Sequence, residues 1–329
     1  MTAREQLAQF AAGSKALPRL CCEYKKERAT VHLKELVGGA LSFYAAAAAA
    51  KTGGVHVFVA EDRDAAAYLM NDFYNLLDEK QVYFFPSSYK RSVAYGAEDA
   101  QGVVQRTAAM NAVKGFTKGY LIVCTYPEAL AERVADAETL RRDTIAVKVG
   151  DSISIAVLED ALVDANFTRV DFVYEPGQYS VRGGIVDVFS FSESKPYRID
   201  FFGDEVDSIR RFNISSQLSA DKLDRVEIIP NLNAGDGAAK VSFVQFAGDA
   251  AAYWFYDADY VLRRVNDIRR RTLADMERPD EIDRLMTSRN ALLGDLANCR
   301  MLALRDNLPE RPATAAVEFD TAPQPKFNK

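Results

Sequence analysis

The residues best suited to specific contacts lie in one predicted strand, YRIDFF at positions 197–202. Because successive side chains of a strand point to opposite faces, Arg198, Asp200 and Phe202 share one face. Arginine and aromatic side chains dominate the energetics of protein interfaces, so this face is typical of a protein-binding surface. The alternative is a surface ion pair between Arg198 and Asp200, worth ~0–1 kcal/mol, with Phe202 packed beneath it. The alternate positions are apolar and are expected to face a core: Tyr197, Ile199 and Phe201.

Four carboxylates lie within a short span around this strand, namely Asp187, Asp200, Asp204 and Glu205. Two carboxylates act as a general acid and a general base only when a cleft separates their pKa values. Arginines and turn residues are the neighbours of these four in the sequence, so we interpret them as members of solvated ion pairs. We therefore predict no catalytic residue among them.

The rest of the chain offers few ligands for a metal ion or a cofactor. Its four cysteines include no C-x-x-C pair, and little surrounds its two histidines, His32 and His56, that would complete a site. The formal net charge of −6 and the pI near 5.2 argue against a chain that lives on nucleic acid. With no signal pattern and no apolar run of bilayer length, we expect a cytoplasmic chain without contact to a membrane.

The pattern of elements predicts an α/β chain with a second domain inserted into the first. Strands alternate with helices up to about residue 141, which favours a parallel sheet covered by helices. Short strands and turns follow to about residue 230, as in a β-meander, and the chain then turns mainly helical, with Asp280 to Arg300 as one helix. The predicted α/β domain comprises residues 1–143 and 231–310, the inserted α+β domain residues 144–230, and a proline-containing, truncated linker residues 311–329.

The spacing of several residues in the meander resembles a known family. Arg182-Gly183-Gly184, Asp187, residues 196–202 and Asp204-Glu205 are similar in type and offset to the second domain of the bacterial transcription-repair coupling factor (Mfd). The same module occurs in the excision-repair helicase UvrB. The resemblance extends from about residue 33 to the tail, and it implies a degenerate RecA-like first domain, similar to domain 1 of UvrB.

The resemblance also implies a partner and a role. Arg182, Arg198 and Phe202 occupy the positions that contact UvrA, and Gly183 and Asp200 support that contact. The implied role is a non-catalytic fragment that recruits UvrA to lesions where RNA polymerase has stalled. In the full-length family protein an ATP- and magnesium-dependent translocase, together with the contacts to RNA polymerase and duplex DNA, lies outside the region that this chain resembles.

The resemblance places a nucleotide-binding turn at residues 36–43, where Gly38 and Gly39 are retained. Such a turn ends in Lys followed by Ser or Thr, and the lysine holds the β- and γ-phosphates. Here Leu41 stands in place of the lysine, before Ser42. We therefore predict a turn that no longer binds nucleotide, and a chain that is not an enzyme.

Two other functions stay open at this point. A UvrB-like helicase subunit would need the lysine and a long tyrosine-rich hairpin, for which residues 85–96 leave no room. A weak duplex DNA-binding module would need a basic surface, such as the arginines between positions 263 and 271. Those arginines alternate with apolar residues at helical spacing, so we interpret them as the solvated side of an amphipathic helix.

Overall fold

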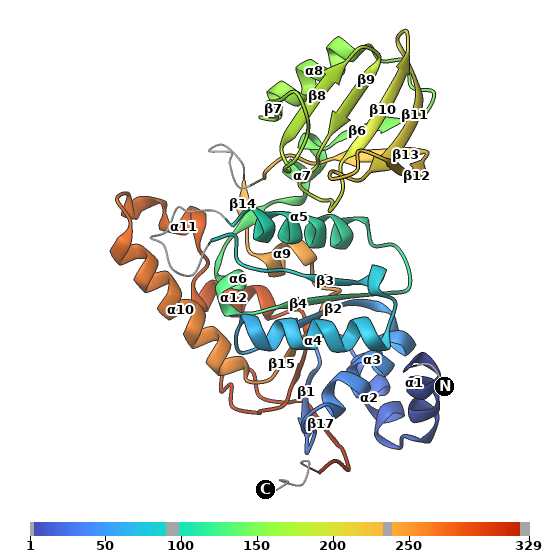
Figure 1. Cartoon of the computed structure of the whole chain (residues 1–329). Coiled ribbons are helices and arrows are strands. Elements are labelled where there is room, and N and C mark those ends of the chain that lie inside the picture. The colour runs from blue at the N-terminus through green and yellow to red at the C-terminus, as the bar shows by residue number, and fades with distance from the viewer. Residues whose placement is uncertain (1–2, 90–98, 233–238, 323–329) are drawn as a thin grey trace, which may run out of the picture. The chain divides into compact units, whose positions relative to one another are not determined.

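The computed structural model describes residues 3–89, 99–232 and 239–322, so most of the stretch compared with a hairpin lies outside the described residues. The chain forms two compact units (Figure 1). The larger unit comprises Met1–Ala97, Ala112–Arg133 and Lys240–Lys329, and the smaller unit comprises Glu98–Asn111 and Val134–Ala239. Helix α5 (Ala100–Gly115) contributes residues to both units.

The larger unit contains a seven-stranded sheet in the order β17-β1-β16-β15-β2-β4-β3, and every neighbouring pair is parallel. Parallel strands covered on both faces are apolar at successive positions, and in β2 every residue from position 55 to 59 is buried. The prediction of a parallel α/β architecture is confirmed. The strands are β1 (Thr30–Lys34), β2 (Gly54–Val59), β3 (Val82–Phe84), β4 (Tyr120–Thr125), β15 (Ala252–Phe255), β16 (Arg300–Ala303) and β17 (Ala315–Glu318).

Helices connect these strands, as Figure 1 shows. The alanine-rich α3 packs against α4, and its residues 45–49 are buried because small side chains permit close approach to the sheet. The carboxylate of Asp62 caps α4 by accepting the N–H of Ala65 at 2.9 Å. The helices are α1 (Ala3–Gly13), α2 (Ala16–Tyr24), α3 (Ala40–Thr52), α4 (Arg63–Leu76), α6 (Pro127–Ala131), α9 (Phe243–Ala247), α10 (Ala258–Asp275), α11 (Ile282–Leu285) and α12 (Arg289–Leu296), with 3-10 turns at Glu79–Gln81 and Pro279–Glu281.

The C-terminal part of the larger unit differs from the prediction. It contributes three strands of the sheet, and the prediction of one helix from Asp280 to Arg300 is wrong. Two short helices, α11 and α12, are separated where Met286 forms a β-bridge with Glu132 and Ser288 caps α12. The segment predicted to be a linker contains the edge strand β17, which pairs along β1. Both differences depend on partners far away in the sequence, which local periodicity does not report.

The smaller unit contains a six-stranded sheet in the order β12-β11-β10-β9-β8-β7, antiparallel except for the pair β7–β8. Its central strands follow one another along the chain, so the predicted β-meander is confirmed. The elements are β5 (Val134–Ala135), α7 (Ala137–Asp143), β6 (Ile145–Lys148), α8 (Ile155–Asp164), β7 (Thr168–Arg169), β8 (Gln178–Arg182), β9 (Ile185–Val188), β10 (Tyr197–Phe202), β11 (Glu205–Phe212), β12 (Ser219–Leu223) and β13 (Arg225–Ile228), and β14 (Lys240–Val241) follows at the return to the larger unit.

One face of the six-stranded sheet packs on the core of the smaller unit. Leu158 and Leu162 of α8 pack there on buried side chains of β8 to β11 and of the β6–β13 pair. Tyr197 and Ile199 belong to this core as predicted, and Phe201 packs against its margin. The alternate residues of the same strands therefore lie on the opposite face.

Candidate protein-binding face of the smaller unit

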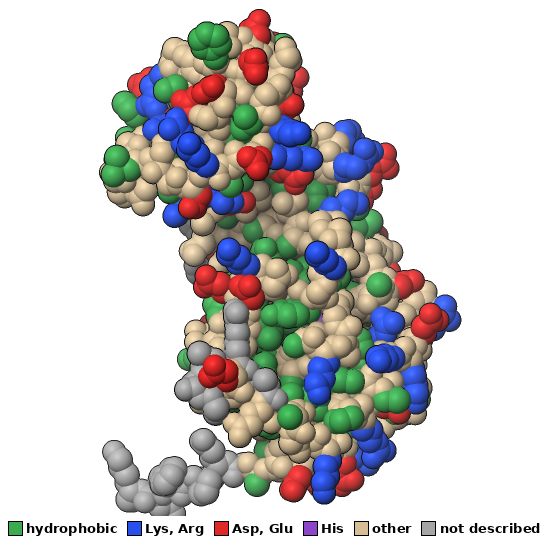
Figure 2. Space-filling view, turned by 90° about the vertical axis from the view of Figure 1, so that its right-hand side faces the viewer, with side chains coloured by type: hydrophobic (Ala, Val, Ile, Leu, Met, Phe, Trp, Pro, Cys, Tyr) green, Lys and Arg blue, Asp and Glu red, His purple; other side chains and the backbone are tan. Residues whose placement is uncertain are grey.

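The outward face of the six-stranded sheet brings the predicted site residues together. The register places Arg198 of β10 opposite Asp187 of β9 and Arg210 of β11. One row along, Asp200 lies opposite Ile185 of β9, which in turn pairs with Arg182 of β8. The strands thus assemble on one face charged residues that are up to 28 positions apart in the sequence (182 to 210). In Figure 2 the smaller unit, at the top, carries cationic and anionic side chains interspersed with isolated hydrophobic ones.

Asp187 is the central residue of this face, although it is only 1% exposed. Its Oδ1 accepts Nε of Arg198 at 2.7 Å, and its Oδ2 accepts Nη2 of Arg198 at 2.9 Å and Nη2 of Arg182 at 2.5 Å. The pair with Arg198 is bidentate, a geometry that fixes the plane of the guanidinium. The hydrogen bond to Asp187 raises the pKa of Arg198, so this side chain stays charged. One carboxylate of β9 therefore joins two arginines on the strands that flank it, β8 and β10.

Arg198 is held from two further directions. Its guanidinium lies over the buried ring of Phe212 at 4.4 Å, a cation–π contact. Its Nη1 donates to the carbonyl of Gln217 at 3.3 Å. Only 15% of the side chain is exposed, so Arg198 presents little of its surface to solvent.

Asp200 has partners of its own, namely Arg210 and the hydroxyl of Ser208, which donates at 2.9 Å. The alternative of an Arg198–Asp200 ion pair with Phe202 beneath it is therefore wrong. Of the four carboxylates interpreted as members of solvated ion pairs, Asp187 and Asp200 are paired with arginine as predicted, but Asp187 is buried instead of solvated.

Two aromatic rings stand out from the charged face. Phe202 is 83% exposed and precedes Gly203, whose φ of +62° makes the turn into β11. Phe172 is 48% exposed and lies 4.8 Å from the guanidinium of Arg182. Sequence reasoning missed Phe172 because it lies in a loop without periodicity, and its contact with Arg182 spans ten positions.

The glycine pair between β8 and β9 shapes the edge of the face next to Arg182. Gly183 has φ of +60°, a conformation that side chains disfavour. A Cβ on Gly184 would lie 3.0 Å from the carbonyl oxygen of Phe201, so glycine permits the close approach of β10. Gly183 thus supports the geometry of the face without itself contributing a side chain.

The sequence is similar to a known domain family and to proteins of transcription-coupled repair. Residues 145–233 match the family model of the UvrB interaction domain. The chain is 29% identical over 199 residues to the transcription-repair-coupling factor of Bacillus subtilis and 28% identical over 199 residues to that of Escherichia coli, in each case over 60% of this chain and 17% of the relative. The protein of that name from Haemophilus influenzae is 30% identical over 128 residues, which cover 39% of this chain and 11% of the relative.

The chain resembles the N-terminal region of the coupling factors. The predicted family resemblance is thereby confirmed. The matched segment spans about a sixth of the length of these coupling factors, since it covers 17% of each of the first two. The match to the UvrB interaction domain includes the whole charged face, from Phe172 to Arg210.

The turn compared with a nucleotide-binding loop lies in the larger unit. Gly38 has φ of +57°, and Gly39 is the N-cap of α3 without a capping side chain. Leu41 borders a cavity of about 300 Å³ at the carboxyl ends of β2 and β15, and the hydroxyl of Ser42 donates to Asp72 at 2.5 Å instead of facing a ligand. The cavity is lined almost entirely by apolar and aromatic residues, with the carboxylate of Glu61 as its charged group: Leu36, Val37, Gly38, Leu41, Phe58, Val59, Ala60, Glu61, Ala65, Leu69, Trp254, Phe255, Tyr256 and Leu304.

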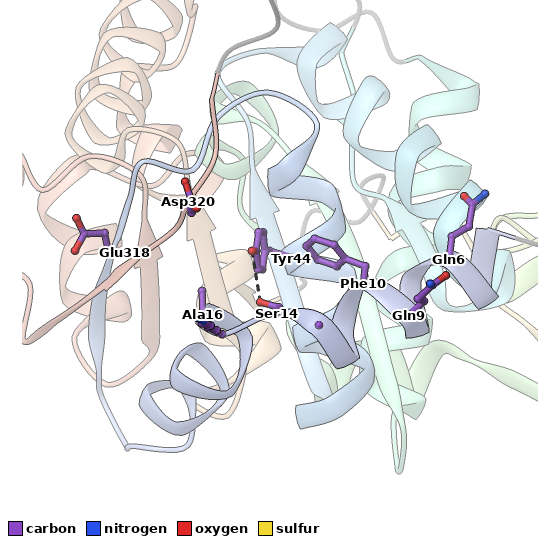
Figure 3. Close-up of a pocket in the computed structure, with 10 residues that line it drawn as sticks. Gln6, Gln9, Phe10, Ser14, Ala16, Tyr44, Glu318 and Asp320 are labelled. Atoms are coloured by element: carbon purple, nitrogen blue, oxygen red, sulfur yellow. Dashed lines mark hydrogen bonds between the residues drawn. The ribbon is translucent and has the colours of Figure 1, made fainter.

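A second hollow of the larger unit, of about 660 Å³, lies among α1, α3 and the end of β17. Figure 3 shows Phe10 and Tyr44 side by side, with Glu318 and Asp320 at one end and Gln6 and Gln9 at the other. The hydroxyl of Ser14 donates to that of Tyr44 at 3.4 Å. These polar groups do not converge on one point, so the hollow suggests no particular chemistry.

Four of the five arginines of α10 pair with carboxylates, as predicted for a solvated helix face. Arg263, Arg264, Arg269 and Arg270 bond to Asp259, Glu128, Asp283 and Asp267 respectively. Among the described residues no cluster of histidine, cysteine and carboxylate side chains is arranged to hold a metal ion. In the same part of the chain, no helix combines the length and apolar character needed to cross a bilayer.

Proposed function

We propose that this chain is a non-catalytic docking module of transcription-coupled DNA repair, and that its charged face binds UvrA. The partner follows from the match of residues 145–233 to the UvrB interaction domain and from the relatives, which are transcription-repair-coupling factors. In this proposal the module recruits UvrA to lesions where RNA polymerase has stalled. The motor, its ATP and magnesium, and the contacts to polymerase and duplex DNA belong to parts of the full-length protein outside this chain. The expected compartment is the cytoplasm.

The observation that carries the proposal is the exposure of Phe202 at the end of β10, the strand that also bears Arg198, together with a pair of arginines fixed by Asp187. Folding leaves 83% of Phe202 exposed, so its apolar surface is removed from water only when another molecule binds to it. Arg182 and Arg198 are already oriented by Asp187, so less side-chain freedom is lost on binding. Aromatic and arginine anchors of this kind often cost ~2 kcal/mol or more of binding energy when truncated.

The larger unit serves in this proposal as a scaffold, a degenerate RecA-like domain. Three observations support the absence of nucleotide chemistry at its carboxyl edge: Leu41 in place of lysine, Ser42 bonded to Asp72, and an apolar cavity with a single acidic group. A triphosphate requires cations and free N–H donors, and a carboxylate such as that of Glu61 repels it.

The experiment is a binding titration of this chain against purified UvrA with the variants Arg182→Ala, Arg198→Ala and Phe202→Ala. Each variant is expected to weaken binding by about tenfold or more, which corresponds to ~1.4 kcal/mol. Circular dichroism before each titration separates loss of binding from loss of fold. Wild-type affinity in all three variants would refute the assignment of the face.

Two matched controls distinguish this face from exposed residues of the same type elsewhere. Tyr68 of α4 is 76% exposed, so Tyr68→Ala removes an equally exposed ring from the larger unit. Arg225 of β13 pairs with Glu227 at the surface, so Arg225→Ala removes an ion-paired arginine from the smaller unit. Both controls are expected to bind UvrA like the wild type.

A further inference from the structure

The charged face contains one residue that the partner cannot reach. Asp187 is 1% exposed, yet it bonds to both arginines of the proposed docking face. We propose that Asp187 is a positioning residue for UvrA binding, which acts by fixing Arg182 and Arg198 in one arrangement. The inference rests on the proposed function and deepens it, because it separates the groups that touch the partner from the group that orients them.

The geometry assigns this role to Asp187 through the strand order. β9 lies between β8, which bears Arg182, and β10, which bears Arg198. A side chain of β9 on the outward face therefore borders both arginines. The guanidinium of Arg182 also contacts the ring of Phe172, and that of Arg198 contacts the ring of Phe212. Without the carboxylate of Asp187, the two neighbouring guanidinium groups would repel each other and separate.

Charge balance gives the same conclusion. Asp187 carries one negative charge against the two positive charges of its arginine partners, while the pair Asp200–Arg210 is neutral by itself. The central cluster therefore keeps one net positive charge, fixed in place at the sheet surface. A long arginine in solvent samples many rotamers, and ordering it at the moment of binding reduces affinity.

The test uses two substitutions with UvrA titrations. Asp187→Asn removes the charge at nearly constant shape, and Asp187→Glu keeps the charge but moves it outward by one methylene. We expect about tenfold weaker binding for the first variant and a smaller loss for the second. Glu159→Gln is the matched control, because Glu159 also bonds to an arginine and a tyrosine of this unit, Arg169 and Tyr179. The control is expected to bind UvrA like the wild type.

A second measurement separates positioning from a merely structural role. If Asp187 acts through the two arginines, Asp187→Asn has a smaller effect on binding in an Arg182→Ala background, where only Arg198 is left to orient, than in the wild type. A full, additive loss in that background would overturn the proposal, as would wild-type affinity of both Asp187 variants. Should Asp187→Asn fail to fold, Asp187→Glu decides by itself, because it keeps the charge and displaces only the carboxylate. Weaker binding by this variant supports the positioning role, and wild-type affinity overturns it.

The outcomes also separate this inference from the proposed function. Wild-type binding by Arg182→Ala, Arg198→Ala and Phe202→Ala means that the whole face is wrongly assigned. Loss of binding in those three with wild-type binding in folded Asp187→Asn and Asp187→Glu means that only the positioning role is wrong.

Discussion

The two units treat buried ionisable groups in opposite ways. On the outward face of the smaller unit, the buried Asp187 forms ion pairs with two arginines. In the sheet of the larger unit, the buried His56 is neutral, and its ring bonds to Trp254 and the carbonyl of Gly53. Near the carboxyl edge of that sheet, the uncharged Leu41 borders an apolar cavity. Burial of an ion is costly unless it is paired, so the smaller unit pairs its buried carboxylate with arginines, whereas the larger unit buries a neutral imidazole.

The comparison also shows that the site of binding does not follow from the architecture. In parallel α/β sheets ligands commonly bind at the carboxyl ends of the strands. Here that edge holds an apolar cavity, whereas the meander carries the oriented arginines and the exposed rings. The proposal of a binding site therefore rests on side chains and not on the type of sheet.

The largest expected effect concerns His56. Burial, with a smaller contribution from Arg300, lowers the pKa of His56 from 6.5 to about 4 in the folded chain. Above pH 6.5 the histidine is neutral in both states and has no effect. As the pH falls from 6.5 towards 4, only the unfolded chain binds the proton, so stability is lost, by about 3 kcal/mol below pH 4.

Urea unfolding of the wild type and of His56→Gln between pH 7.5 and 4.5 measures this loss. The substitution removes the titrating group, so the stability of the variant is expected to fall less steeply through this window. Carboxylates titrate alike in both proteins and cancel in the difference. Parallel pH profiles for the two proteins would contradict a buried, neutral His56.

The next effect concerns the charged pair itself. Arg198→Ala leaves Asp187 with Arg182 alone, and loss of one partner of a buried ion pair is strongly destabilising. Because Arg198 is 15% exposed and Arg182 remains, we expect a loss of about 2 kcal/mol in the free energy of unfolding. Phe202→Ala removes only exposed surface and is expected to stay within ~0.5 kcal/mol of the wild type.

Chemical denaturation of both variants measures their free energies of unfolding, and so compares an ion-paired residue of the face with an exposed one. Arg182→Ala is expected to fall between the two, since 36% of its side chain is exposed. Equal stabilities for Arg198→Ala and Phe202→Ala would mean that the Asp187 pair does not stabilise the unit.

Part of this arrangement could be predicted from the sequence, and the rest depends on long-range pairing. The alternation of strands with helices up to about residue 141 and the alternation of side chains at 197–202 predicted a parallel sheet and a two-faced strand, because both patterns are local. The role of Asp187 required knowing that β9 lies between β8 and β10, which no local pattern contains. The division between α11 and α12 depends likewise on the bridge from Met286 to Glu132.

The smallest expected effect is on nucleotide binding by Leu41→Lys. The substitution introduces the residue type that the resemblance places at this turn. It tests whether the carboxyl edge of the larger unit's sheet lacks only one charge for binding an anionic ligand. The cavity beside it remains apolar, Glu61 remains, and Ser42 remains bonded to Asp72. A lysine alone therefore finds no partner groups for a triphosphate, and we expect no detectable affinity for magnesium-ATP by calorimetry. Saturable binding by Leu41→Lys, absent from Leu41→Met, would show instead that the turn lacks only its lysine and that the degeneration of the edge is shallow.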